Sequence, residues 1–148
     1  MKRECLTRDE LLAGIRTSLG GRAAELLYYG REAGLTTGAS SDLEKATNIA
    51  RQMICRYGMD EEFGLLATPE LFKHAEAMSS PMYQRVNELA GRILKEQMEQ
   101  TLKLMEANRR HLDAVSKSLL EKNRLYRKDL EELLPPILGE RGAAMRIL

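Results

Sequence analysis

Cysteine is scarce in this chain, and tryptophan is absent. Cys5 and Cys55 are too few and too far apart for a disulfide framework, and neither belongs to a Cys-x-x-Cys pair of the kind that binds zinc. No run approaches the roughly 20 apolar residues that cross a bilayer, and the N-terminal residues lack the apolar segment of a signal peptide. We therefore expect the chain alone to be soluble and cytoplasmic.

An excess of charge of either sign is also lacking. The 148 residues contain 23 basic and 22 acidic side chains, so the formal net charge is only +1. A balance of this kind creates no broad field to attract nucleic acid. Aromatic residues make up 5% of the chain, which leaves few rings to stack on bases. An RNA-binding helical protein is therefore a weak alternative, and we expect no nucleic-acid partner.

Two motifs that would assign chemistry directly are missing. There is no Gly-x-x-x-x-Gly-Lys-Ser/Thr loop to hold nucleotide phosphates, so we expect no ATP site in this chain. The two histidines, His74 and His111, do not form a His-Glu-x-x-His zinc motif. Each lone histidine is more typical of a polar surface residue than of a metal ligand.

Helical patterns dominate what is present. Thr7-Arg8-Asp9-Glu10 is a capping box that predicts a helix beginning near Thr7. Apolar spacing continues past Gly20-Gly21 and predicts one helix to about Tyr29, with a break at the two glycines as the alternative. Residues 30–40 are predicted to be a loop.

A second capping box, Ser41 with Glu44, predicts another helix that begins at about Ser41 and stops near Gly58. The apolar residues of this predicted helix recur at a spacing of three and four and form one stripe. They are Leu43, Ala46, Ala50, Met53 and Tyr57.

The rest of the chain reads as one irregular region followed by more helices. Residues 59–81 are punctuated by glycine and proline, with a possible helical turn over 69–77. A long amphipathic helix, which we expect to be the longest, begins at Met82, and shorter helices follow over 112–123 and 128–134. The long stripe is Val86, Leu89, Ala90, Ile93, Leu94, Met98, Leu102 and Met105.

These patterns predict an all-α fold, a bundle of about five helices with the long amphipathic helix near the C-terminal half. We expect a helical domain over residues 1–134 and a flexible tail over 135–148, because Pro135-Pro136 stops the last helix.

Asp42 is the one acid that invites a functional interpretation. In the first turn of its predicted helix a carboxylate is favoured by the helix dipole, by about 0.3–1 kcal/mol. The same carboxylate could supply one oxygen ligand to a metal. The residues alone favour the first interpretation.

Four segments follow one another in the chain: Leu19-Gly20-Gly21-Arg22-Ala23-Ala24-Glu25, Thr36-Thr37-Gly38-Ala39-Ser40-Ser41-Asp42-Leu43, Ala46-Thr47-Asn48-Ile49-Ala50-Arg51-Gln52-Met53 and Tyr57-Gly58-Met59-Asp60. In this order they closely resemble the FtsH family of membrane-anchored, ATP-dependent zinc metalloproteases. The resemblance implies a helical peptidase domain, polypeptide substrates and a homo-oligomer, a hexamer in the family. It also implies zinc held by the two histidines of His-Glu-x-x-His and by an aspartate that matches Asp42.

Departures from the family limit what the resemblance implies here. The histidine motif, the ATPase module and the membrane anchor would all precede Met1, and Leu26 stands where many relatives carry a glutamate. We therefore expect the carboxyl-terminal part of a metallopeptidase domain, with Asp42 as candidate third zinc ligand and no proteolysis by the chain alone. ATP would act only through the missing ATPase module, and the parent enzyme would lie on the cytoplasmic side of the membrane. The alternative is a non-catalytic module that binds partner subunits through the helices of residues 82–123.

Overall fold

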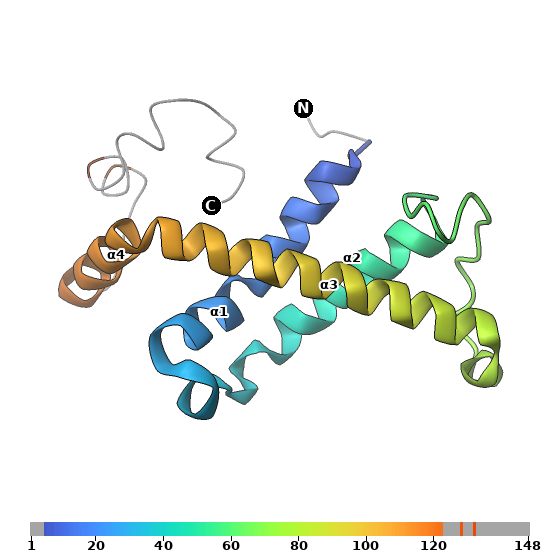
Figure 1. The fold of residues 1–148 in the computed structure, drawn as a ribbon, viewed down its shortest axis with the longest axis horizontal. Helices are drawn as coiled ribbons and strands as arrows, with labels where there is room; N and C mark the ends of the chain where they lie inside the picture. The colour runs from blue at the N-terminus through green and yellow to red at the C-terminus, as the bar shows by residue number, and fades with distance from the viewer. Residues whose placement is uncertain (1–4, 123–127, 129–131, 133–148) are drawn as a thin grey trace. The chain divides into compact units, whose positions relative to one another are not determined.

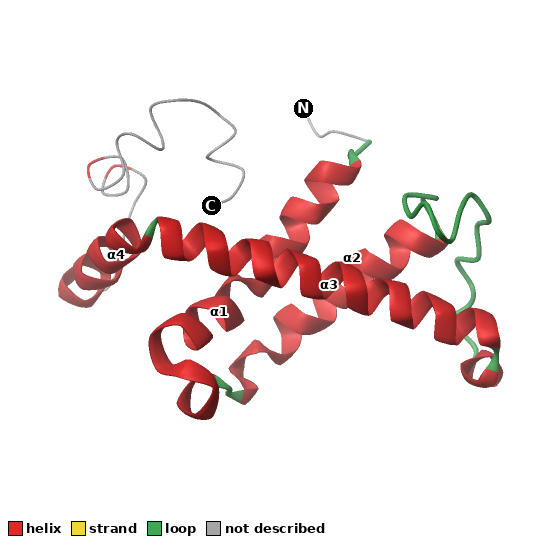
Figure 2. Cartoon of the chain, viewed as in Figure 1, coloured by secondary structure: helices red, strands yellow, loops and turns green. Residues whose placement is uncertain are grey.

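The computed structural model describes residues 5–122, 128 and 132. Four α-helices and two short 3-10 helices form this part of the chain, and no strand occurs among its residues (Figures 1 and 2). The all-α prediction is confirmed. The predicted helix over 128–134 and the tail over 135–148 fall almost entirely outside the described residues, so the boundary at residue 134 stays a prediction. The chain divides into two compact units, Met1–Thr101 and Leu102–Leu148.

Helix α1 (Arg8–Gly34) begins at the predicted capping box. The Glu10 amide donates to the Thr7 hydroxyl at 3.1 Å, and the Glu10 carboxylate accepts from the Thr7 amide at 2.9 Å. The helix runs through Gly20-Gly21, so the alternative of a break there is wrong. It kinks instead at Gly30, whose φ of 73° is open to glycine and strained for other residues. Residues 31–34 then add a helical turn, so the predicted loop begins too early.

Helix α2 (Ser40–Cys55) follows the 3-10 helix η1 (Thr37–Ala39). Its buried residues include Ala46, Ala50 and Met53 of the predicted stripe. Tyr57 is exposed, which corrects its place in the stripe: the helix ends at Cys55, and the chain turns away through Gly58 at a φ of 59°.

The irregular region between α2 and α3 is confirmed, but its internal helix lies later than predicted. Turns occupy residues 69–73, and the 3-10 helix η2 (Ala75–Ser79) follows. The Phe72 and Tyr83 rings pack against each other with their centroids 4.6 Å apart. This contact joins the irregular region to the start of the next helix.

Helix α3 (Pro81–Ala107) matches the predicted long helix. It has 27 residues, the same number as α1, but it is the longest described helix without a kink. Asn108 separates it from α4 (Arg109–Lys122), and the Asn108 side-chain amide donates to the Leu104 carbonyl at 2.7 Å. This helix α4 confirms the prediction over 112–123 and belongs to the second unit.

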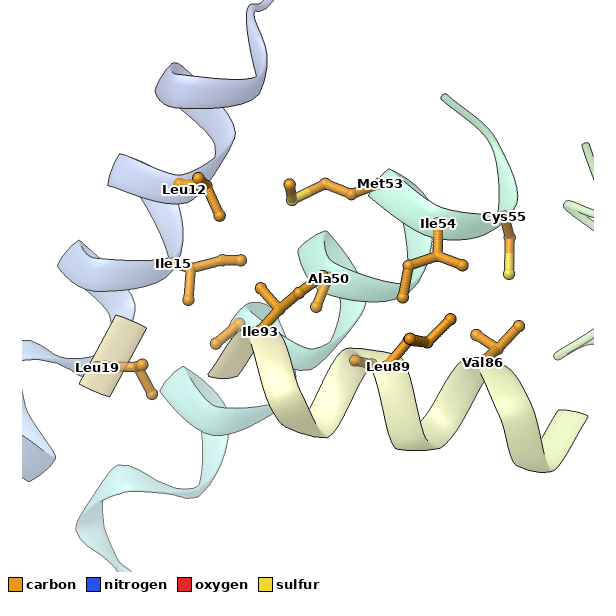
Figure 3. Packing of buried hydrophobic residues seen from close by; sticks show 12 residues of the cluster. Leu12, Ile15, Leu19, Ala50, Met53, Ile54, Cys55, Val86, Leu89 and Ile93 are labelled. Atoms are coloured by element: carbon orange, nitrogen blue, oxygen red, sulfur yellow. The ribbon is translucent and has the colours of Figure 1, made fainter. Parts of the chain in front are cut away.

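The hydrophobic core of the first unit lies where α1, α2 and the first part of α3 meet. Helices α1 and α2 lie side by side and α3 crosses them (Figure 1). Figure 3 shows side chains from all three helices pointing into one cluster. Its buried members are Leu12, Ile15, Leu19, Ala46, Ala50, Met53, Ile54, Cys55, Val86, Leu89, Ala90 and Ile93.

The buried face of α3 becomes polar toward its C-terminal half, which the apolar pattern did not indicate. Gln97 and Thr101 are both 4% exposed. The Gln97 side-chain oxygen accepts a hydrogen bond from Arg16 Nη1 of α1 at 2.6 Å, and the Thr101 hydroxyl donates to the Gln97 carbonyl at 2.7 Å. These partners satisfy polar groups that would otherwise be costly to bury.

None of the described helices has a stretch both long enough and apolar enough to span the hydrocarbon core of a bilayer.

Candidate functional site

The turn that leads into α2 positions Asp42. The Thr36 hydroxyl accepts a hydrogen bond from the Gly38 amide at 3.2 Å, which starts η1. The Ser40 amide donates to the Thr37 carbonyl, so η1 passes directly into α2. Asp42 therefore lies in the first turn of a helix whose entry is already fixed by a tighter turn.

The predicted capping box of Ser41 and Glu44 is wrong. The N-cap position of α2 is Ala39, and no side chain caps the helix. The reason is local: because α2 continues directly from η1, Ser41 lies inside the helix and not at the extended N-cap position that a capping box requires.

Two charged side chains of α1 hold the same turn from the other side. The Glu25 carboxylate accepts from the Thr36 hydroxyl at 3.3 Å and from the Thr36 amide at 3.4 Å. The Arg22 Nη2 donates to the Thr36 carbonyl at 3.0 Å. Thr36 is thus tied to α1 through its side chain and both of its backbone polar groups. The sequence showed Arg22 and Glu25 only as members of a family motif, and it did not indicate that they bind Thr36.

Gly34 allows the chain to reach this position. It is buried, and a Cβ placed on it would lie 2.4 Å from the carbonyl oxygen of Glu25. Since no side-chain atom fits at that distance, the backbone of the short turn after Gly30 packs directly against α1. We call the contacts of Gly34 and Thr36 with Arg22 and Glu25 the α1–turn latch.

Asp42 is partly buried and faces a small residue of α1. A Cβ placed on Gly21 would lie 3.9 Å from the Asp42 Oδ2. No other described residue donates a hydrogen bond to the Asp42 carboxylate or forms an ion pair with it. The helix therefore fixes the backbone of Asp42, and the carboxylate has glycine beside it and no described partner on its oxygens.

The described residues do not make a zinc site by themselves. A structural or catalytic zinc takes at least three protein ligands, and no group of three His, Cys, Asp or Glu side chains that could hold a metal occurs among the described residues. His74 lies just before η2, and His111 lies on α4 in the second unit. Asp42 can contribute one ligand, and the others would have to come from residues outside this described part.

Neither cysteine belongs to a group of described residues that could hold a metal. Cys5 is exposed and Cys55 is buried at the end of α2, and both thiols are free. Burial raises the pKa of the Cys55 thiol, against smaller lowering effects of the Thr68 hydroxyl and of the Arg51 charge. A neutral buried thiol is a small apolar group in the core and a poor nucleophile.

Residues 1–133 match the model of peptidase family M41. This chain belongs to that family. The match covers every motif discussed above, including the latch and Asp42. The FtsH resemblance seen in the sequence is thereby confirmed.

Curated relatives of this M41 chain share about a third of its residues. It is 33% identical over 147 residues to the ATP-dependent zinc metalloprotease FtsH of Pseudothermotoga lettingae, covering 93% of this chain and 23% of the relative. It is 35% identical over 147 residues to FtsH 1 of Methylacidiphilum infernorum, covering 94% and 23%. For FtsH of Trieres chinensis the identity is 37% over 139 residues, covering 87% and 21%. The chain thus spans less than a quarter of the length of these relatives.

Proposed function

We propose that this chain is the carboxyl-terminal helical part of the peptidase domain of an ATP-dependent zinc metalloendopeptidase, in which Asp42 supplies one zinc ligand. The observation that carries the proposal is the position of Asp42: it lies in the first turn of α2, directly after the turn that the α1–turn latch holds, and its carboxylate has no described partner. In the whole enzyme the zinc would polarise a peptide carbonyl and activate a water. The role of this chain would be to hold Asp42 in place and to supply helices that pack the domain.

The substrates proposed for the whole enzyme are unfolded or unneeded polypeptides. ATP would act through a separate module, and membrane attachment through a separate anchor. The subunits would form a homo-oligomer, a hexamer by the family resemblance. The single ligand contributed by the described residues supports the further proposal that the isolated chain does not hydrolyse peptide bonds.

A chimeric enzyme tests the role of Asp42. The matching segment of the Pseudothermotoga lettingae relative would be replaced by this chain, and casein hydrolysis and bound zinc would be measured. We expect an active chimera in which Asp42→Asn lowers activity by a factor of at least about 100 and lowers zinc content, because removal of a metal ligand weakens the site.

The matched control is Asp9→Asn, which removes an exposed acid from the first turn of α1. It should leave both zinc content and hydrolysis unchanged. If Asp42→Asn behaved like Asp9→Asn, the carboxylate would be only a helix-terminal acid and the proposal would fail. The isolated chain gives the second measurement: casein cleavage that a chelator abolishes would contradict its predicted inactivity.

The alternative is a non-catalytic module of this family that binds partner subunits through residues 82–123. Helices α3 and α4 together cover most of this range, up to Lys122, and each contains both polar and apolar residues. The chimera distinguishes the two proposals, because a non-catalytic module would restore assembly without restoring hydrolysis.

A further inference from the structure

A basic hollow lies beside the C-terminal half of α2, about nine residues beyond Asp42 and therefore roughly 13 Å farther along the helix. Its volume is about 270 Å³. We propose that this hollow binds a small oxyanion such as phosphate. The residues that line it are Asn48, Arg51, Gln52, Cys55, Arg56, Pro69, Phe72 and Lys73.

The charge of the side chains that line the hollow favours an anionic ligand. Three lining side chains are cationic and none is a carboxylate. Lys73 is already paired with Glu70 at 3.0 Å between Nζ and Oε1, so the attraction rests on Arg51 and Arg56. The Arg56 guanidinium has no hydrogen bond or ion pair with another described residue. An unneutralised guanidinium in a concave site attracts anions and offers them paired N–H donors.

The Arg51 guanidinium is held in place without being neutralised. Its central carbon lies 4.3 Å from the centroid of the Phe72 ring, a cation–π contact. Its Nε and Nη2 donate to the Asn87 side-chain oxygen at 3.3 and 3.1 Å. Because that acceptor is an uncharged amide, the full positive charge of Arg51 remains. A fixed donor loses less conformational freedom when a ligand binds, which favours affinity.

The size of the hollow limits the class of ligand. Pockets for drug-sized molecules usually measure about 300–1,000 Å³, and this one is slightly smaller. A phosphate or a similarly small oxyanion fits within this volume. The side-chain amides of Asn48 and Gln52 add polar atoms that can donate to the same anion. The proposal does not depend on a zinc ligand role for Asp42.

Titration of the full chain with inorganic phosphate, followed by amide NMR at constant ionic strength, tests the site. We expect saturable shifts of the amides of Arg51, Arg56 and Lys73. Arg56→Gln should weaken the affinity about tenfold, as loss of one charge-assisted hydrogen bond predicts. Because this side chain has no described partner, the substitution leaves the fold intact, which unchanged amide spectra outside the hollow would verify.

The matched control is Arg31→Gln, which removes an exposed arginine of α1 outside the hollow. It should leave the phosphate affinity unchanged. If both substitutions weakened the phosphate affinity equally, that affinity would depend only on the net charge of the chain, and the proposal would be overturned. Linear, non-saturating shifts in the unaltered chain would overturn it as well.

Discussion

At the scale of single residues, Gly34 shows how one missing side chain shapes the site. This position needs glycine because another stretch of backbone lies very close to it. Its own backbone is not left-handed: among the described glycines only Gly30, Gly58 and Gly64 have a positive φ. A Cβ at Gly34 would lie 2.4 Å from the oxygen and 2.9 Å from the carbon of the Glu25 carbonyl group. Rigid backbone cannot yield as a flexible side chain can, so the latch depends on this position.

Gly34→Ala is therefore expected to destabilise the protein, by about 1–3 kcal/mol, a cost typical of overpacking. Denaturant unfolding would measure the change. The matched control is Gly91→Ala on α3, where a Cβ would meet no heavy atom within 4 Å. Because alanine is the better helix former, this control should stabilise the protein by up to about 1 kcal/mol. Equal effects of the two substitutions would contradict the close contact at Gly34.

At the scale of helices and loops, ion pairs connect the loop between α2 and η2 to helix α3. The Glu62 carboxylate bonds Arg85 at 2.6 Å and also bonds Arg92, and both arginines lie on α3. The hydrogen bond and charge of Arg92 chiefly, and those of Arg85 in addition, lower the pKa of Glu62 below its usual value. All three side chains are about half exposed. Because they are exposed, these ion pairs hold the loop against α3 but add little to the stability of the fold.

The lowered pKa of Glu62 sets the sign of a pH effect. The stabilisation is fully present above the ordinary glutamate pKa of 4.5 and is lost as the pH falls through the lower, folded-state pKa. Glu62→Gln should thus lower the melting temperature modestly near neutral pH, and this difference should vanish in acid. Calorimetry across that range would measure it. The neighbouring Glu61→Gln, which removes an exposed glutamate from the same turn, should show no such trend; a similar trend in both would disprove the assignment to Glu62.

At the scale of the whole molecule, several large apolar side chains of the described residues are exposed to solvent. Leu65 is 90% exposed, Tyr29 70% and Leu66 58%. Leu65 and Leu66 are neighbours in the loop between α2 and η2, and exposed apolar side chains gathered on one surface usually mark a contact with another part or partner.

We accordingly expect the isolated chain to self-associate and to bind a dye specific for apolar surface. Light scattering over a range of concentrations would measure the association. The double substitution Leu65→Ser and Leu66→Ser should reduce dye binding clearly, whereas Leu6→Ser, at a single exposed leucine, should reduce it little. A chain that remained monomeric at every concentration and bound no dye would contradict this expectation.

Local sequence patterns were enough to predict the four α-helices and the family. Local signals carried both: the Thr7 capping box and the three-to-four-residue apolar spacing act within a few positions, and the motif order needs no folded contact. The prediction that Asp42 lies in a first helical turn is confirmed, although the capping box used to place the start of that helix does not form. Its role as a zinc ligand stays a proposal.

Tertiary structure decided how these helices are joined. The hydrogen bond from Arg16 to Gln97 links positions 81 apart, and the bonds from Thr36 to Glu25 link positions 11 apart. Neither pairing follows from helical periodicity, because a polar residue on an apolar face can be recognised as buried only when its partner is known. The start of α2 likewise depended on the turn before it, which replaced the capping box that the sequence predicted.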